Sequence, residues 1–416
     1  MKRIYLDCAS LTPIDPRVLR EMKKYYSPEY ANPSSLYREG VAAKKALEEG
    51  RKMVADFIHA HADEVVFTSG GTEANGLALE GAGRAAHRNG IAKPHIIISA
   101  IEHSSIMETA AMLEKHGVSV TRLPVDARGI ISLEELKKSI TPDTFMVSIM
   151  TVNNETGVIQ PIREIVKIVR DWKKQGSNHP STSSGQAKIS AYPLFHTDAA
   201  QALYEDLNME KTGIDLLTLD SSKMYGPRST GCLYIRRGTP IEPIVYGGGQ
   251  EAGMRSGTEN IPAVRGFAKA LEIIQKEGSN HPSTSSGQAK KQKESARLLV
   301  LRTYFIDQLK RIRPDIVIHG EGGQVSPHIL NVSIPGIDNE FFVLQLDAKG
   351  IACSTKSSCL RDEDESYVLK AIGADSSTSV RFSFGRWTKK GHVKKAIRVI
   401  ETVLGSSNNQ DTRTKK

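Results

Sequence analysis

Short, almost wholly apolar runs alternate with longer amphipathic stretches over the first two thirds of the chain. The apolar runs lie at 65–68, 95–99, 145–150 and 216–219. Between them, segments such as 104–116 and 162–174 place apolar residues three and four positions apart, which predicts helices. Strands that are apolar throughout and separated by helices are typical of a mostly parallel sheet with both faces covered. The pattern therefore predicts an α/β fold.

The pattern changes after about Pro262. A long helical stretch, over 263–275 and again over 291–312, precedes shorter strands and a last helix over 389–404. We predict a large domain over 17–260 and a smaller α/β domain formed by 1–16 and 261–404. The polar residues 405–416 are expected to form a disordered tail.

One segment, GSNHPSTSSGQAK, occurs twice, at 176–188 and at 278–290. The copies are identical and lie in unrelated contexts, unlike the units of a solenoid. Their Ser, Asn, Gly and Pro content predicts surface loops, whose lengthening costs little entropy. We interpret both copies as insertions that the fold tolerates; a shared binding epitope is the alternative.

Composition narrows the class of protein. The chain has 416 residues, of which 39% are hydrophobic and 25% charged, as in soluble globular proteins. No apolar run approaches the roughly 20 residues that span a membrane, and the N-terminus has no signal-peptide pattern, so a cytoplasmic location is predicted. The net charge is +9, but the basic residues are spread along the chain. Nucleic acid is therefore not expected as the primary ligand, while anionic ligands or an acidic partner remain open.

The cysteines differ in their surroundings. They are Cys8, Cys232, Cys353 and Cys359. They are too scattered for a disulfide framework and include no C-x-x-C pair, so no metal site is predicted. Cys359 lies in a hydroxyl-rich segment near Lys356 and Arg361, a setting that favours a thiolate. Cys353 adjoins an apolar strand and is the better candidate for an inert thiol.

Polar segments follow several predicted strands, where α/β sheets place their ligands. Gly71 and Thr72, in the run SGGTEAN, open a helix whose free N–H groups suit a phosphate, although a capping turn explains them equally well. His103 follows the next strand, and a lone histidine there is more often structural. Asn154, in VNNETG, is a weak signal by itself.

Three charged residues also follow or occupy predicted strands. Asp198, in HTDAAQ, is an acid at a strand end. Lys223 follows the apolar strand 216–219, and partial burial lowers the pKa of a lysine and favours Schiff-base chemistry. Arg381 alternates with apolar residues in VRFSFGR, which indicates an anionic partner: either a substrate carboxylate or a structural ion pair.

Taken together, these segments resemble the cysteine desulfurases, class V enzymes of fold type I that use pyridoxal 5′-phosphate (PLP). The resemblance also includes MRSGTEN over 254–260 and ILNVS over 329–333, and it covers almost the whole chain apart from the duplicated segments and the tail. It implies the fold of type I PLP-dependent transferases. It also implies conversion of L-cysteine to L-alanine, with the sulfur passed on as a persulfide for iron–sulfur cluster assembly or tRNA thiolation.

The resemblance assigns roles to residues of this chain. Lys223 would hold PLP covalently and move protons, Arg381 would take the carboxylate of L-cysteine, and Cys359 would carry the persulfide to an acceptor such as an iron–sulfur scaffold protein. The other residues implied to contact PLP are His103, stacked on the ring; Asn154, beside it; Asp198, at the pyridinium nitrogen; Gln201, at the phenolic oxygen; and Gly71, Thr72, Ser222 and Thr258, at the phosphate. Thr258 would come from the second subunit of a homodimer.

Two departures from the family pattern matter. Many members have Ser-x-His-Lys where this chain has Asp220, Ser221, Ser222 and Lys223. Ser222 can still donate to a phosphate, whereas Asp220 is expected to point elsewhere. In the segment that contains Cys359, Lys356 stands where the family usually has a glycine. The alternatives are another class V reaction, such as that of a selenocysteine lyase, β-lyase or aminotransferase, and a non-catalytic scaffold.

Overall fold

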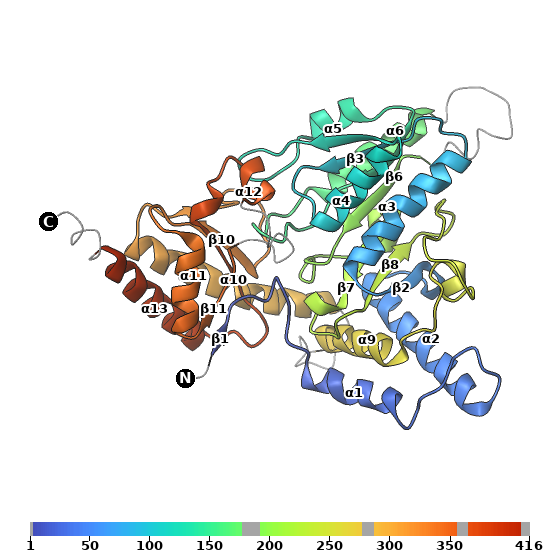
Figure 1. The fold of residues 1–416 in the computed structure, drawn as a ribbon, viewed down its shortest axis with the longest axis horizontal. Coiled ribbons are helices and arrows are strands. Elements are labelled where there is room, and N and C mark those ends of the chain that lie inside the picture. The colour runs from blue at the N-terminus through green and yellow to red at the C-terminus, as the bar shows by residue number, and fades with distance from the viewer. Residues whose placement is uncertain (1–2, 177–191, 277–286, 356–364, 409–416) are drawn as a thin grey trace.

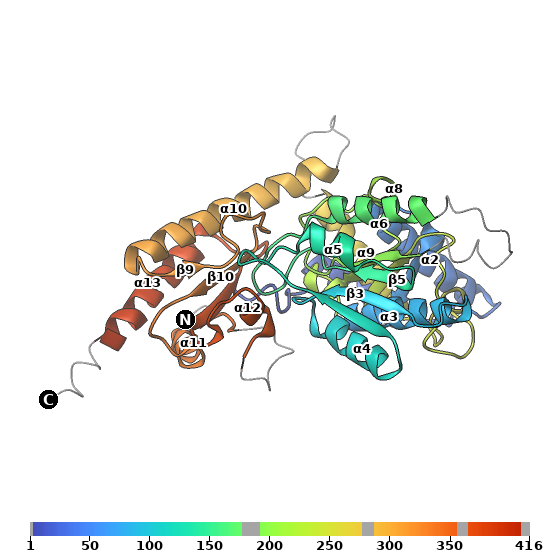
Figure 2. The same cartoon turned by 90° about the horizontal axis from the view of Figure 1, so that it is seen from above.

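The computed structural model describes residues 3–176, 192–276, 287–355 and 365–408. Figure 1 shows two lobes: a larger one built around the main sheet, and a smaller one that contains the C-terminal helices. The turned view in Figure 2 shows the long helix α10 (Gly287–Ile312) extending along the top of the smaller lobe. No helix in these ranges is long and apolar enough to cross a membrane.

The large domain contains a seven-stranded sheet in the order β2-β8-β7-β6-β5-β3-β4. The strands are β2 (Val65–Thr68), β3 (His95–Ser99), β4 (Ser119–Leu123), β5 (Thr144–Ser148), β6 (Leu194–Asp198), β7 (Leu216–Asp220) and β8 (Gly231–Ile235). Only β8 runs antiparallel to its neighbours in this sheet. The predicted strands are confirmed, although β5 ends two residues before the apolar run does.

Helices cover both faces of this sheet. They are α1 (Pro16–Tyr26), α2 (Arg38–Ile58), α3 (Gly71–Arg88), α4 (Ser104–Lys115), α5 (Leu133–Ser139), α6 (Ile162–Gly176), α8 (Met209–Thr212) and α9 (Ile261–Lys276). Successive residues of a strand point to opposite faces. In β3, Ile97 joins the core beneath α2 and α6, while Ile96 and Ile98 join the core beneath α3 and α4. This explains why the strands are apolar throughout.

Helix α9 packs on the large domain, although the predicted boundary at residue 261 assigns it to the small one. Its apolar face contacts α1 and α2, and Val264, Phe267 and Leu271 belong to the main core. The strand–helix alternation in the sequence stops at residue 261, and this change in pattern predicted the domain boundary there. An amphipathic helix follows the surface that buries its apolar face, and a change in sequence pattern does not reveal that surface.

The small domain combines two sheets with the helices α10, α11 (Asn339–Ala348), α12 (Tyr367–Ala371) and α13 (Lys390–Asn408). One sheet has the order β12-β10-β9, with β12 (Ser379–Ser383), β10 (Ile329–Ser333) and β9 (Val317–Ile318). The other pairs β1 (Ile4–Tyr5) with β11 (Ile351–Ala352) in parallel.

Two predictions at segment ends are wrong. Residues 405–408 continue α13, whose preceding turn is anchored by the buried Val403 and Leu404, so they are not part of a disordered tail. Gly176 ends α6, and Gly287 to Lys290 begin α10, so the ends of the two repeated segments are helical. The remaining repeat residues and 409–416 lie outside the described residues.

The sheet brings the polar segments to one edge. Strands β3, β5, β6 and β7 are parallel, and β2 runs the same way because β8 is antiparallel to both β2 and β7. Their carboxyl ends therefore face the same side, which is where open α/β sheets bind ligands.

Candidate active site

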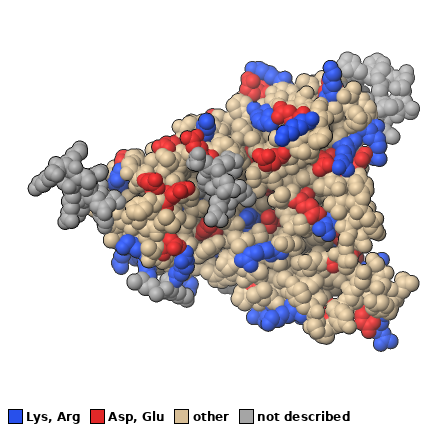
Figure 3. Space-filling view, viewed as in Figure 1, with Lys and Arg blue, Asp and Glu red and all other residues tan. Residues whose placement is uncertain are grey.

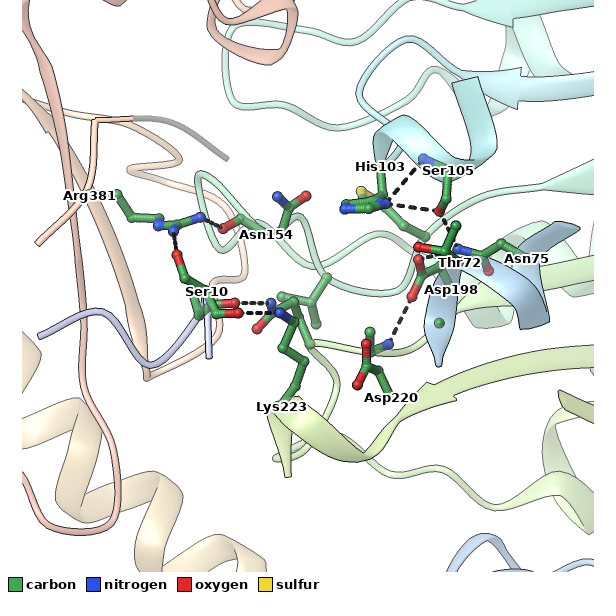
Figure 4. A pocket seen from close by; sticks show the side chains of 16 residues that line it. Ser10, Thr72, Asn75, His103, Ser105, Asn154, Asp198, Asp220, Lys223 and Arg381 are labelled. Carbon is green, nitrogen blue, oxygen red and sulfur yellow. Dashed lines mark hydrogen bonds between the residues drawn. The ribbon is translucent and has the colours of Figure 1, made fainter. Parts of the chain in front are cut away.

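A pocket lies at this edge of the sheet (Figure 4). Eight of the eleven predicted site residues line it: Gly71, Thr72, His103, Asn154, Asp198, Gln201, Lys223 and Arg381. They come from five strand ends of the large domain and from β12 of the small domain. Residues separated by up to 310 positions in the sequence, from Gly71 to Arg381, are thus brought together at the boundary of the two lobes.

One end of the pocket is suited to an anion. Gly71 is the first residue of the 18-residue helix α3, and Thr72 follows it. The backbone N–H groups of a first helical turn have no partner within the helix, so they attract negative charge. The preceding Gly70 has φ 146°, a conformation that side chains disfavour, so glycine is required at this turn.

Asp220, rather than Ser222, lines the pocket at this end, which overturns the expectation that Asp220 points elsewhere. Its Oδ1 accepts the N–H of Ser222 at 2.8 Å and caps a short 3-10 turn. This bond directs Oδ2 toward Gly71, where a Cβ atom would lie only 3.4 Å from it. Ser222 is buried, and its carbonyl accepts from the backbone and hydroxyl of Thr12.

Two donors orient the Asp198 carboxylate in the pocket. Asn75 Nδ2 donates to Oδ2 at 2.8 Å, and the Ala200 N–H donates to Oδ1 at 2.9 Å. Asn75 also donates to the hydroxyl of Ser105, which fixes the amide plane. The carboxylate is therefore held in one orientation and remains available to a cationic ring nitrogen.

His103 caps helix α4, and this role fixes its tautomer. Its Nδ1 accepts the backbone N–H of Ser105 at 3.2 Å, so the ring proton lies on Nε2. The neutral ring lines the pocket on the side of α4 (Figure 4). A planar, neutral imidazole held in this way is suited to stacking on a flat ligand.

Lys223 follows β7, and its side chain enters the pocket from the opposite side to His103 (Figure 4). Its Nζ donates to the carbonyl of Ser10, in the segment between β1 and α1. The amine thus lies between the two lobes, in contact with a segment that links them.

Arg381, on β12, is 1% exposed and is the largest fully buried side chain of the described residues. Its guanidinium donates to the carbonyl of Asn154 at 2.8 Å, to the hydroxyl of Ser10 at 2.6 Å and to Asp7 at 3.1 Å. Its Nε–H has no hydrogen-bond acceptor among the described residues. Asp7 is thus an ion-pair partner of Arg381, while binding of a substrate carboxylate stays a prediction.

Three residues at the site, Asn75, Ser10 and Asp7, were not predicted from the sequence. Asn75 lies one helical turn after Gly71, and this spacing is a usable signal that both face the same side of α3. Ser10 and Asp7 lie in a segment without a local signal. Their place beside Lys223 and Arg381 depends on how the N-terminal segment crosses between the lobes.

Three cysteines lie in the described residues, and all three are poor nucleophiles. Burial raises the pKa of Cys8 to about 12 and raises those of Cys232 and Cys353 further. Their thiols thus stay protonated at neutral pH. Cys359 lies outside the described residues. Thr258 is exposed and does not line the pocket of its own chain.

The donor set fits PLP. A helix terminus can hold the phosphate, Asp198 can face the ring nitrogen, His103 can cover the ring and Lys223 offers an amine for a covalent link. The buried Nε–H of Arg381 lacks an acceptor, as expected where a carboxylate substrate completes the site. Against this fit stands Asp220, a carboxylate at the anion end.

Comparisons with known proteins identify the family of this chain. The family model described as aminotransferase class-V matches residues 4–176 and 186–395, so the match is interrupted inside the first repeated segment. The chain is 36% identical over 410 residues to a protein named cysteine desulfurase IscS from Dictyoglomus turgidum, covering 97% of this chain and 95% of the relative.

Solved structures are also similar to this chain over nearly its whole length. The chain is similar to a structure titled NifS-like protein, with a TM-score of 0.83 and 31% identity over 97% of this chain and 99% of the other. It is also similar to a structure titled SspA in complex with cysteine, with a TM-score of 0.73 and 30% identity over 93% and 100% of the two chains. The mostly parallel sheet and the smaller C-terminal lobe are thus shared with known structures.

Proposed function

Because the chain belongs to the class-V aminotransferase family and matches cysteine desulfurases over nearly its whole length, we propose that it converts L-cysteine to L-alanine and transfers the sulfur to Cys359. The observation that carries the proposal is the pocket, in which an anion-binding helix terminus, Asp198, Lys223 and Arg381 converge. PLP, when bound there, supplies an electron sink for charge that develops on the substrate.

We assign each residue a role from the chemistry of its side chain. Arg381 binds the carboxylate of L-cysteine, since it is buried and has a free donor. Asp198 holds a proton at the cofactor's ring nitrogen, and Asn75 keeps its carboxylate in place. Lys223 takes the proton from the substrate Cα and later supplies one to Cβ. The fixed orientation of these groups lowers the entropic cost of the reaction.

Sulfur transfer requires a thiolate. The Cys359 sulfur attacks the sulfur of the bound substrate, so that an S–S bond forms while the substrate's C–S bond breaks and its electrons pass to Cβ. Cys359 is the best candidate because burial keeps the other three thiols protonated. We expect the persulfide to pass to a thiol of an acceptor such as an iron–sulfur scaffold protein.

The described residues that flank Cys359 are tied to the site. Ser354 exchanges backbone hydrogen bonds with Arg381, at 3.1 and 2.6 Å. Ser366 donates from its hydroxyl to the buried Glu155, next to Asn154, at 2.6 Å. Cys359 lies five positions after Ser354, an extended reach of about 17 Å. A chain of this length is long enough to bring the Cys359 thiol from Ser354 to the pocket.

A homodimer completes the proposal. Large apolar side chains between α1 and α2 are exposed, including Tyr30 at 71% and Leu36 at 96%. This segment borders the start of α9, because Ile261 packs with Ala31 and Ala43. Thr258 is three residues before Ile261, so the exposed apolar surface and Thr258 share one side of the molecule. A second subunit covering this surface would bury it and receive Thr258.

The test is the reaction of PLP-loaded protein with L-cysteine, with alanine measured and persulfides mapped by mass spectrometry. We expect alanine and a persulfide on Cys359. Cys359→Ser should abolish persulfide and sulfur transfer while leaving the cofactor's visible absorbance intact, and Lys223→Ala should remove that absorbance. Cys232→Ser is the matched control. Alanine formation by Cys359→Ser at the wild-type rate would contradict the proposed role of Cys359.

A further inference from the structure

His328 lies just before β10 in the small domain, and its buried ring contacts the pocket residue Gln201 of the large domain. The distance from His328 Nε2 to Gln201 Oε1 is 3.1 Å. On the other side of the ring, His328 Nδ1 lies 2.8 Å from the hydroxyl of Ser326. The ring also packs against Tyr204, with centroids 5.2 Å apart.

These contacts show which atom donates and which accepts in the hydrogen bonds from Ala9 through Gln201 to His328. Gln201 Nε2 lies 2.8 Å from the carbonyl of Ala9, which can only accept, so the amide nitrogen faces Ala9. Oε1 therefore faces His328 and must accept from Nε2–H. Burial and the nearby Arg381 lower the pKa of His328 to about 3, which favours the neutral ring. In that form Nδ1 carries no proton and accepts from the Ser326 hydroxyl.

One N–H of Gln201 remains after these bonds are made. Its amide nitrogen has two protons, and Ala9 takes one of them. Gln201 lines the pocket, so the second proton is available to a ligand there. Under the proposed function, that ligand atom is the phenolic oxygen of PLP.

We infer that His328 is a positioning residue that holds the Gln201 amide with its N–H toward the phenolic oxygen of the cofactor. Without the donor on His328, Gln201 Oε1 is a buried acceptor that lacks a partner, and the side chain turns to satisfy it. The bond also crosses between the two domains, so the orientation of Gln201 depends on how the small domain is seated.

The experiment titrates the visible chromophore of the PLP-loaded enzyme with pH. A donor to the phenolic oxygen stabilises the deprotonated chromophore, so its loss raises the chromophore pKa. For His328→Phe we expect a rise of about half a unit to one unit, the equivalent of one hydrogen bond. Tyr204, which packs against His328, does not change charge between about pH 6 and 9, because burial raises its pKa well above its ordinary value. Glu102, whose pKa burial raises to about 8, is present in the wild type and in the variant, so the difference between the two titrations reports the chromophore.

Two amide variants separate positioning from packing. His328→Gln places a donor near the Nε2 position and should retain the wild-type chromophore pKa. His328→Asn is shorter, reaches only the Nδ1 position and should behave like His328→Phe. This pair keeps the test available even if the phenyl variant does not fold.

A double-mutant cycle completes the test. In a Gln201→Leu background, His328→Phe should cause no further shift of the chromophore pKa. An unchanged pKa in His328→Phe, or the same shift with and without Gln201, overturns the inference. The inference rests on the proposed function, but the two fail differently: a wild-type protein that forms no visible chromophore with PLP contradicts the proposed function itself.

Discussion

Asp220 places a carboxylate beside the helix terminus that is proposed to bind the cofactor phosphate. Its Oδ1 is used to cap the turn before Lys223, so the residue has a local structural reason to be acidic. Its Oδ2 faces Gly71, so the negative charge also opposes a second anion at the same place.

The first prediction follows from this charge. Asp220→Ser and Asp220→Asn keep a cap acceptor and remove the charge, so each should tighten PLP binding on the order of tenfold. Equilibrium dialysis measures the dissociation constant. Pyridoxal, which lacks the phosphate, is the matched control ligand and should show no change. An equal gain for pyridoxal would show that the effect does not act through the phosphate.

Glu102 is a buried acid that the proposed mechanism does not use. Burial raises its pKa to about 8, while hydrogen bonds from Ser99 and the Met150 N–H oppose the rise. The folded protein therefore keeps Glu102 protonated at neutral pH, while the unfolded chain ionises it above about pH 4.5. Folding stability should fall as pH rises from about 4.5 to about 8 and then level off.

The second prediction is that Glu102→Gln removes this loss of folding stability at higher pH. The gain in the free energy of unfolding of Glu102→Gln over the wild type should be about 2 to 4 kcal/mol larger at pH 8 than at pH 5. The thermal midpoint of the variant should exceed that of the wild type by more at pH 8 accordingly. Calorimetry at both pH values measures it. Glu108→Gln, exposed on α4, is the control and should show no pH-dependent difference. A constant difference at both pH values would contradict the protonated state of Glu102.

At the scale of elements, strand ends and helix starts supply most of the site, and α12 anchors the segment that carries Cys359. Ser366 caps the N-terminus of α12: its hydroxyl accepts the Leu369 N–H at 3.2 Å and donates to Glu155 at 2.6 Å. One hydroxyl thus links the helix, the cysteine segment and the loop that contains Asn154.

The third prediction concerns this hydroxyl. Ser366→Ala should slow persulfide formation about three- to tenfold, because the cysteine segment loses an anchor, while the cofactor spectrum stays unchanged. Stopped-flow mixing followed by acid quench measures the rate. Ser132→Ala removes the equivalent cap of α5, away from the pocket, and should leave the rate unchanged. Equal slowing in both variants would indicate general destabilisation instead.

At the scale of the whole molecule, the acidic and basic side chains are interspersed over the face seen in Figure 3. This face shows no continuous basic surface of the kind that binds nucleic acid. The exposed apolar segment between α1 and α2 is the better candidate for an interface, and Ile261, three residues after Thr258, packs against it at Ala31.

The fourth prediction is that light scattering gives twice the 45.6 kDa chain mass. Mixed dimers then test which site Thr258 serves. A dimer of a Lys223→Ala chain with a Thr258→Val chain should bind one PLP with wild-type affinity, since one site keeps both residues. A dimer of the wild type with the double variant should lose that tight site. The reverse result would place Thr258 in the site of its own chain.

The sequence by itself determined most of the elements and most of the residues that line the pocket. Apolar runs of four to six residues predicted the strands because a strand buried on both faces must be apolar at every position. Polar residues just after those strands predicted the site because parallel strands end at one edge of a sheet. Of the eight predicted residues that line the pocket, six end or follow such strands, Arg381 lies within a strand, and Gln201 was named only by the family resemblance.

Only the tertiary structure decided the contacts that depend on distant partners. It assigned α9 to the large domain, turned Asp220 toward Gly71, placed Ser10 and Asp7 against Lys223 and Arg381, and joined His328 to Gln201. Each contact joins elements far apart in the chain, and local pattern carries no information on the direction of a side chain across such a distance. That direction is set by packing and by the need of each buried polar group for a partner.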